Sequence, residues 1–423
     1  MHRLLTFASA VALAILPATA DWLEWRGSPL RDGIWRDISL PAVIPSGGFP
    51  TAWKATLGQG YSGPSVAGNR VYVMDRLKPP LAEVDTERVV CLDAQDGHFL
   101  WTNAYPCAVH YPYGYENGPR NTPLIEGNSV YTLGGMGTLS SLDAVSGSIR
   151  WRHDLAAEYH AHIPNWGVSS QPLLVGDSLV VMVGNTNDAC VVAFDKGTGK
   201  EHWRSLSERP SYVPLLSIPN GSGRSAIVWT ADGVHGLDTQ TGAEQWGFPF
   251  RCKYDEAVHT PLFDGTKHRL YFPHDWSGTL VVQLDSDHQH ATLVGTNRNL
   301  SMLHSAAVLL DGVIYAVNHN SGDAPAQGEL RALDVKSGEL LWKTNAVTPM
   351  KRWAQAAITY NEGNHCAYIL NDQGELILAR LTRSGYEELG RSQISGKTWS
   401  HPAFSNGCVY VRSETSLICA KLK

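Results

Sequence analysis

A motif of aspartate, glycine and tryptophan recurs five times in this chain and limits its possible folds more than any other feature. The clearest copy, at residues 332–342, reads Ala-Leu-Asp-Val-Lys-Ser-Gly-Glu-Leu-Leu-Trp. In every copy the glycine follows the aspartate by four residues and the tryptophan follows it by eight. The copies are Asp93, Gly97 and Trp101; Asp143, Gly147 and Trp151; Asp195, Gly199 and Trp203; Asp238, Gly242 and Trp246; and Asp334, Gly338 and Trp342. Such invariant spacing indicates a structural repeat.

Each residue of the motif predicts a piece of local structure. Apolar residues such as Val90 and Leu92 precede the aspartate and indicate a buried strand. The aspartate can accept hydrogen bonds from backbone N–H groups two residues on, and the glycine permits a positive φ, so together they predict a tight turn. A second strand follows and is expected to end on the tryptophan, which is suited to wedge between neighbouring units. The copies recur roughly every 50 residues, a period typical of a propeller.

The two ends of the chain complete this prediction. The segment 51–57 around Trp53 resembles the tryptophan-bearing last strand of a unit, but no earlier strands precede it. The segment 400–422 has three strands and lacks a fourth. Pairing the two ends would close a ring and remove its exposed edge. We therefore predict an all-β, eight-bladed propeller of four-stranded antiparallel blades; the alternative is seven blades, if one degenerate unit is misread.

Composition excludes several classes of protein. The chain has 423 residues, of which 17% are charged, and 40 glycines and 23 prolines, which suits short strands joined by turns. Its net charge is −6 and no basic stripe is present, so we expect no nucleic-acid partner. Seven scattered cysteines show no Cys-x-x-Cys spacing; we expect small core residues, and one or two disulfides remain open.

The N-terminus has the pattern of a secretory signal. A basic start, an apolar run over 4–16 and the small residues Ala18 and Ala20 predict a signal peptide at 1–20 and a single propeller domain at 21–423. No later segment reaches the length of a membrane span. We expect an exported, periplasmic or secreted soluble protein that is monomeric.

Candidate binding residues come from the positions just before the innermost strand of each blade. These strands line the central channel, so the residues that precede them meet at one mouth. Side chains from separate blades that converge on one axis are typical of a small-molecule pocket. The predicted ligand-binding set is Arg120, Asn121, Trp166, Gln171, His259, His304, Gln355, Trp399 and His401.

Several of these residues allow more than one interpretation. Arg120 could hold an anion or a quinone against aromatic faces, and Trp166 and Trp399 could stack on a ligand or simply pack. His259, His304 and His401 could bind a metal or transfer a proton; alternatively, they bond backbone or water. The segment 285–290 superficially resembles a metal loop, but a surface turn is expected there. We predict no metal site.

The repeat Ala-x-Asp-x-x-x-Gly-x-x-x-Trp resembles that of the pyrroloquinoline quinone (PQQ)-like propellers. This family includes quinoprotein alcohol dehydrogenases and the BamB-type outer-membrane assembly factor. The resemblance covers roughly residues 22–422, and the segments 25–27, 118–120 and 397–402 are similar to a bacterial subgroup of PQQ-binding-like propellers. It implies the propeller fold, and for the dehydrogenases it implies PQQ with calcium as the cofactor.

This chain departs from both branches of the family. It has no adjacent cysteine pair and no alignable carboxylate set for calcium, as the dehydrogenases have, and no lipid-bearing cysteine, as the assembly factor has. We therefore expect a non-catalytic binding or scaffold module, without a cofactor, for a protein or small ligand. The alternative is a quinoprotein-type oxidoreductase that oxidises an alcohol or sugar; a metal-dependent hydrolase or lyase is a third hypothesis.

Overall fold

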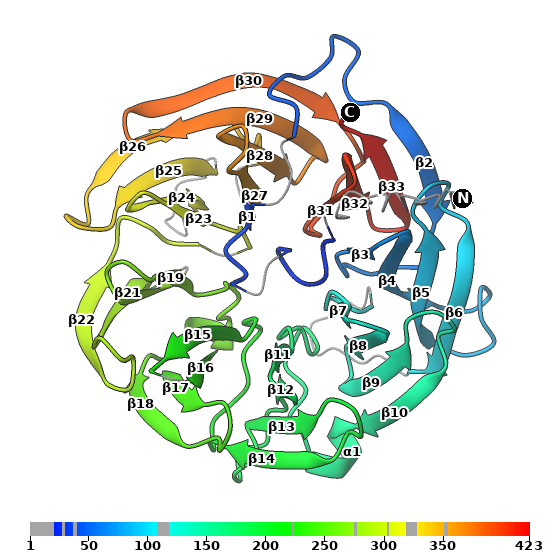
Figure 1. The fold of residues 1–423 in the computed structure, drawn as a ribbon, viewed down its shortest axis with the longest axis vertical. Helices are drawn as coiled ribbons and strands as arrows, with labels where there is room; N and C mark the ends of the chain where they lie inside the picture. Colours follow the sequence, from blue (N-terminus) through cyan, green and yellow to red (C-terminus); the bar gives the residue numbers. More distant parts are fainter. Residues whose placement is uncertain are drawn as a thin grey trace, which may run out of the picture.

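The computed structural model is a ring of eight β-sheets around a central axis (Figure 1). It describes residues 21–27, 30–36, 40–107, 118–221, 223–274, 277–302, 304–318, 328–350 and 354–423. The predicted signal peptide at 1–20 lies outside the described residues. Each blade is built on four antiparallel strands, which in blades one to seven follow sequence order from the axis to the rim (Figure 1). In blade eight the outermost strand comes from the N-terminal region, and blade seven carries one additional short parallel strand.

Blades one to four take their strands in sequence order. Blade one contains β3 (Ser65–Ala67), β4 (Arg70–Leu77), β5 (Thr86–Asp93) and β6 (Phe99–Pro106); blade two contains β7 (Leu124–Glu126), β8 (Ser129–Leu133), β9 (Thr138–Asp143) and β10 (Ile149–Asp154); blade three contains β11 (Leu173–Val175), β12 (Ser178–Met182), β13 (Val191–Asp195) and β14 (Glu201–Ser205); and blade four contains β15 (Leu216–Asn220), β16 (Gly223–Trp229), β17 (Gly233–Asp238) and β18 (Glu244–Pro249).

Blades five to eight repeat the pattern, with two additions from the N-terminal region. Blade five contains β19 (Leu262–Asp264), β20 (Arg269–His274), β21 (Gly278–Leu284) and β22 (Ala291–Asn297); blade six contains β23 (Val308–Leu310), β24 (Val313–Asn318), β25 (Glu329–Asp334) and β26 (Leu340–Thr344); blade seven contains β27 (Ala356–Asn361), β28 (Cys366–Asn371), β29 (Glu375–Thr382) and β30 (Gly385–Gln393), with β1 (Ile34–Trp35) beside β27; and blade eight contains β31 (Ala403–Ser405), β32 (Cys408–Arg412), β33 (Ser416–Lys421) and β2 (Thr51–Thr56).

The ring closes as the sequence predicts. Strand β2 pairs antiparallel with β33, and Trp53 lies opposite Cys419. The N-terminal strand thus supplies the missing outer strand of the last blade, and the eight-bladed count is confirmed. Within the described residues, helical structure is limited to two short segments, α1 (Leu155–Tyr159) and the 3₁₀ turn η1 (Lys253–Asp255). Neither approaches the length and apolarity that a transmembrane helix would need, and the rest of the described chain holds no candidate either.

The motif aspartate and glycine build the predicted turn. The Asp143 Oδ1 atom accepts hydrogen bonds from the backbone N–H groups of Val145 (3.0 Å) and Ser146 (2.9 Å), and Gly147 has a φ of +72°. The aspartates of the other four copies accept bonds in the same way. One expectation was wrong: the outer strand continues past its tryptophan, since Trp101 is only the third residue of β6.

The motif tryptophan locks each blade to the next. The ring of Trp101 lies so close to Gly147 of blade two that a Cβ there would stand 2.4 Å from its Cε3 atom. The Trp101 Nε1–H donates a hydrogen bond to the Ala144 carbonyl (3.1 Å). Four more tryptophans donate to the next turn in this way: Trp53 to Ala94, Trp151 to Lys196, Trp203 to Thr239 and Trp342 to Thr382. The tryptophan predicted to wedge between blades therefore also joins them by a hydrogen bond from its indole N–H.

Trp246 is the one motif tryptophan that donates no such hydrogen bond among the described residues. It therefore allows the contribution of this bond to stability to be tested. The turn that follows it, in blade five, lacks the motif, and the buried Trp246 Nε1 atom has no partner. We expect Trp203→Phe to reduce the free energy of unfolding by about 1 kcal/mol more than Trp246→Phe, because only the first removes a made hydrogen bond. Guanidinium unfolding of both variants measures the difference. Equal losses would show that the wedge stabilises by packing alone.

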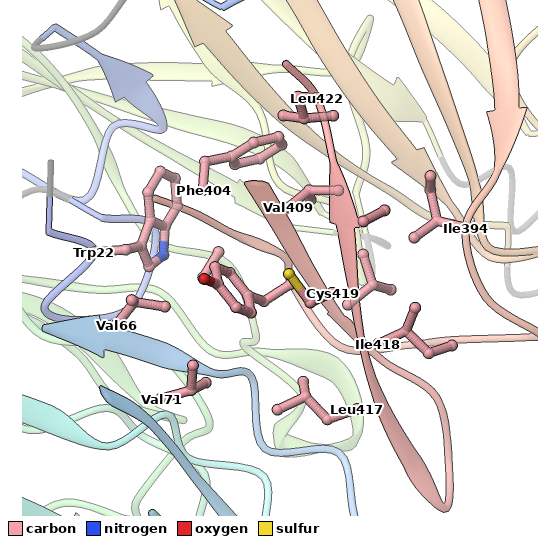
Figure 2. Packing of buried hydrophobic residues seen from close by; sticks show 14 of the residues in the cluster. Trp22, Val66, Val71, Ile394, Phe404, Val409, Leu417, Ile418, Cys419 and Leu422 are labelled. Carbon is pink, nitrogen blue, oxygen red and sulfur yellow. The ribbon is translucent and has the colours of Figure 1, made fainter. Parts of the chain in front are cut away.

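The described parts of the N-terminal segment, residues 21–27 and 30–36, lie across the central channel, which the sequence did not reveal (Figure 1). Strand β1 pairs in parallel with β27 of blade seven, and Trp22 forms a β-bridge with Val66 of blade one. The Trp22 ring packs against Phe404 of blade eight, with ring centroids 5.6 Å apart (Figure 2). It also packs against Trp35 of β1, again with centroids 5.6 Å apart. Trp22 and Trp35 of this segment are thus part of the hydrophobic core.

Two ion pairs organise this axial segment. The Arg31 side chain is fully buried and pairs with Glu24 at 2.8 Å. It also donates to the carbonyls of Gln171, Pro172 and Leu215, which belong to blades three and four. Farther along, Arg36 pairs with Asp32 at 2.6 Å near the surface. The axial segment is therefore fastened to the inner edge of the ring by a buried cation.

The cysteines match the expectation of core residues. All seven are free thiols, and all but the half-buried Cys408 are buried. The segment 285–290 forms a turn, as predicted, yet His288 within it is buried and its Nδ1 atom lies 2.6 Å from the Pro219 carbonyl of blade four. This contact joins blade five to blade four where the tryptophan lock is incomplete.

Candidate functional site at the mouth of the ring

A cavity of about 510 Å³ opens at one mouth of the ring. The residues just before the inner strands line its wall, and residues of the axial segment close its floor. A second hollow, of about 540 Å³, lies on the other side of this segment and is lined by Trp22, Leu30 and Arg224, among others. The axial segment therefore separates two hollows, and we call the first of them the cup.

Eight of the nine predicted binding residues line the cup. They are Arg120, Trp166, Gln171, His259, His304, Gln355, Trp399 and His401. The ninth, Asn121, is buried behind the wall, where its Nδ2 atom donates to the carbonyls of Leu133 and Val168. These bonds hold the chain between blades two and three. Asn121 therefore does not line the cup as predicted, and its side-chain amide contacts the protein backbone instead.

The side-chain amides of Gln171 and Gln355 also form hydrogen bonds within the wall itself. The Gln171 amide accepts from the Thr122 N–H (2.9 Å) and donates to the Thr122 carbonyl (2.6 Å), which ties blade three to blade two. The Gln355 Nε2 atom donates to the Thr398 carbonyl at 3.4 Å. These amides shape the cup, but their hydrogen-bonding capacity toward a ligand is reduced.

One side of the cup is a row of stacked planar groups. Tyr61 and Trp399 stack with centroids 5.8 Å apart and planes 21° apart, and Trp399 stacks on His304 at 6.2 Å and 15°. The Arg120 guanidinium lies over the Tyr61 ring, 5.3 Å from its centroid. Trp399 keeps 38% of its surface exposed. An exposed tryptophan held in a stack offers a flat, apolar surface to a ligand.

The floor comes from Trp25 and Arg26 of the axial segment. The Trp25 ring lies 3.9 Å from the His401 ring, between centroids, and its Nε1–H donates to the Thr260 hydroxyl (3.0 Å). The buried Arg26 side chain donates to the carbonyls of Asp32 and Ala307. Burial lowers the pKa of Arg26 to about 10, so it remains a cation at neutral pH. Sequence reasoning missed both residues, since nothing in the repeat places the N-terminal segment at the axis.

His259 and His401 are neutral at the edge of this floor. Burial lowers the pKa of His259 to about 3, and burial together with the Arg26 charge lowers that of His401 to about 3. The His259 Nδ1 atom lies 2.8 Å from the Ser305 carbonyl, so it must carry the ring proton. The Nε2 atom is then an acceptor, and it is buried without a hydrogen-bond partner.

The histidines do not form a ready metal site. In the part of the chain that the structure describes, the only three His, Cys, Asp or Glu side chains close enough to share an ion are Asp93, Asp96 and His98. These belong to an exposed turn of blade one, far along the chain from the cup. His259, His304 and His401 line one cavity without converging on a single point.

Comparison with known proteins agrees with this architecture. The family model described as outer membrane protein assembly factor BamB matches residues 42–187, 87–344 and 187–423. BamB from Yersinia pestis is 23% identical over 301 residues, which is 68% of this chain and 70% of that protein. BamB from Burkholderia pseudomallei is 26% identical over 199 residues, covering 39% of this chain and 48% of that protein.

Solved structures of two kinds share the fold. BamB from Moraxella catarrhalis has a TM-score of 0.57 at 15% identity and covers 88% of this chain and 99% of that one. A europium-containing methanol dehydrogenase has a TM-score of 0.66 at 13% identity and covers 93% of this chain and 89% of that one. At these identities the likeness concerns the fold alone. The family match spans the propeller, and the chain therefore belongs to the PQQ-like β-propeller family described as outer membrane protein assembly factor BamB.

Proposed function

We propose that this protein is an exported binding module, in which the ring is a rigid support and the cup holds a ligand without chemistry of its own. The observation that carries the proposal is the cup: a cavity of about 510 Å³ with a closed floor and a stacked aromatic wall. A large, mostly apolar cavity with a few convergent polar groups is typical of a ligand site. The family relatives are named as assembly factors, which supports a scaffold role.

The cup residues also support binding without a quinone cofactor. A calcium-type cation needs about six to eight oxygen ligands, several of them carboxylates. Among the described residues that line the cup, Glu256 is the only carboxylate, and its Oε1 atom accepts a hydrogen bond from the Trp166 Nε1–H (3.1 Å). This set does not fit a PQQ–calcium site. Purified protein mixed with PQQ, calcium or a lanthanide, an alcohol panel and a dye is expected to reduce no dye; sustained reduction would favour the oxidoreductase.

The cup itself is tested by fragment binding. We expect small aromatic fragments, detected by saturation-transfer NMR, to bind the wild-type protein and to bind Trp399→Ala at least tenfold more weakly, because the variant removes the exposed stacking surface. Leu30→Ser is the matched control, since Leu30 is exposed in the second hollow on the other side of the axial segment. Fragments that bind Trp399→Ala as well as they bind Leu30→Ser would contradict a ligand site in the cup.

Export is tested on the protein made in a bacterial host. We expect a mature chain that starts at Asp21 and is released with the periplasmic or secreted fraction. Mass spectrometry of the intact protein measures this. An intact Met1 in a cytoplasmic fraction would contradict export while leaving the cup unaffected.

A further inference from the structure

One arginine at the cup, Arg26, forms no ion pair with a described carboxylate; burial lowers its pKa, and the nearby Asp32 charge offsets only part of that effect. Glu24 pairs with Arg31, and Asp32 pairs with Arg36. The third carboxylate, Asp21, accepts a hydrogen bond from the Gly68 N–H (2.8 Å). Arg26 makes no ion pair with any described residue, and its guanidinium donates to two backbone carbonyls, those of Asp32 and Ala307. A buried guanidinium in this position is complementary to an anion.

The unpartnered acceptor of His259 lies on the same part of the wall as this cation. Arg26 is held by the Ala307 carbonyl and His259 by the Ser305 carbonyl. Between them, Ala306 pairs in parallel with Ala357 of blade seven, so the carbonyls of residues 305 and 307 point to the same side of an extended segment. Residues two apart in such a segment are separated by about 6.6 Å. The guanidinium and the imidazole are therefore spaced to contact adjacent groups of one small molecule.

The third feature is the aromatic wall. The Tyr61–Trp399–His304 row and the Arg26–His259 pair line the same cavity. A ligand that satisfies all three would have a carboxylate for Arg26, a neighbouring hydroxyl that donates to His259 Nε2, and a flat apolar group for the wall. His401 lies beside both polar residues, and as a neutral ring it adds no repulsion or attraction for an anion.

We propose that the cup binds an aromatic 2-hydroxycarboxylate, whose carboxylate accepts from Arg26 and whose hydroxyl donates to His259 Nε2. This proposal rests on the cup being a ligand site, and it specifies the ligand class. In a 2-hydroxy acid the hydroxyl is on the carbon next to the carboxylate. This arrangement suits the spacing of the Arg26 and His259 side chains. The anion neutralises the buried cation. The hydroxyl satisfies His259 Nε2, the buried unpartnered polar atom on a described residue that lines the cup.

Three ligands of nearly equal size separate the contribution of the carboxylate from that of the hydroxyl. Mandelate carries both groups, phenylacetate lacks the hydroxyl, and mandelamide lacks the charge. By isothermal titration calorimetry at pH 7.5, we expect mandelate to bind at least tenfold more tightly than either analogue. His259→Phe should remove the preference for mandelate over phenylacetate, and Arg26→Gln should remove the preference for mandelate over mandelamide. Arg26→Lys keeps the charge and should keep part of that preference.

The outcomes distinguish this proposal from the function on which it rests. Aromatic fragments that require Trp399, together with equal binding of the three ligands to the wild-type protein, would overturn the hydroxy-acid proposal and leave the cup as a ligand site. Absence of any binding that depends on Trp399 would overturn both. Because the wild-type comparison decides the first point, an Arg26 variant that fails to fold does not affect the test.

Discussion

Arg31→Ala is expected to lower the free energy of unfolding by about 3–5 kcal/mol, since it removes one partner of a buried ion pair. The substitution leaves the Glu24 carboxylate buried without its cation and frees three carbonyls on blades three and four. Burial already raises the pKa of Glu24 despite the Arg31 charge. The axial segment would lose its main polar fastening, so the floor of the cup should loosen as well.

Guanidinium unfolding followed by tryptophan fluorescence measures this effect. The matched control is Arg36→Ala on the same segment, where the Arg36 side chain is 40% exposed and its pair with Asp32 is expected to contribute less than about 1 kcal/mol. If the two variants lost equal stability, the buried network would not be what fastens the axial segment. Limited proteolysis of Arg31→Ala near residue 31 would show directly whether the segment leaves the channel.

Acid is expected to destabilise the protein well above the pH at which carboxylates titrate. His259 and His401 have an ordinary pKa near 6.5 when unfolded and a pKa of about 3 when folded. Their contribution is therefore complete above about pH 6.5 and is lost as the pH falls towards 3, because the unfolded chain binds protons that the folded one excludes. Each histidine should cost about 1.4 kcal/mol per pH unit. His401 is partly exposed and should contribute the smaller share.

The free energy of unfolding measured from pH 7 to 4.5 tests this slope. The double variant His259→Gln and His401→Gln should lose most of this dependence on pH. His235 is the control, because its pKa is raised: burial acts to lower it, but hydrogen bonds to Glu208 and Glu244, each 2.9 Å away, outweigh burial. His235 stabilises the fold below its unfolded pKa and stops doing so as the pH rises through its folded pKa. His235→Gln should therefore leave the dependence of the unfolding free energy on acid pH unchanged. If His235→Gln reduced this slope, the acid effect could not be attributed to His259 and His401.

The fold could be predicted from sequence because the repeat motif is local. An aspartate and a glycine four residues apart define a turn through bonds within that turn, as at Asp143 and Gly147. Recurrence of the turn then implies the ring, and Trp53 without its own blade implies the closure. The exceptions have the same origin: where blade five lacks the motif, Trp246 loses its hydrogen bond and His288 supplies a different contact.

The cup could be predicted only in part. The rule that residues before inner strands meet at one mouth agrees with the position of eight of the nine candidates, which line the cavity; their role in binding stays a prediction. It failed for Asn121, because position before a strand does not determine whether a side chain faces the channel or the neighbouring blade. It also said nothing of Trp25 and Arg26, whose segment carries no repeat.

The ring and its blade count follow from the sequence alone, because turns and strand pairing depend on neighbours that are close in the chain or in register. The sequence placed part of the wall as well, but not Tyr61 of its aromatic row. What fills the axis of the ring depends on the three-dimensional fold. The seating of segment 21–36 depends on contacts between residues more than a hundred positions apart, such as Arg31 with Leu215 and Arg26 with Ala307. Those contacts close the channel into a cup and place a buried cation beside an open acceptor, and no local pattern specifies either.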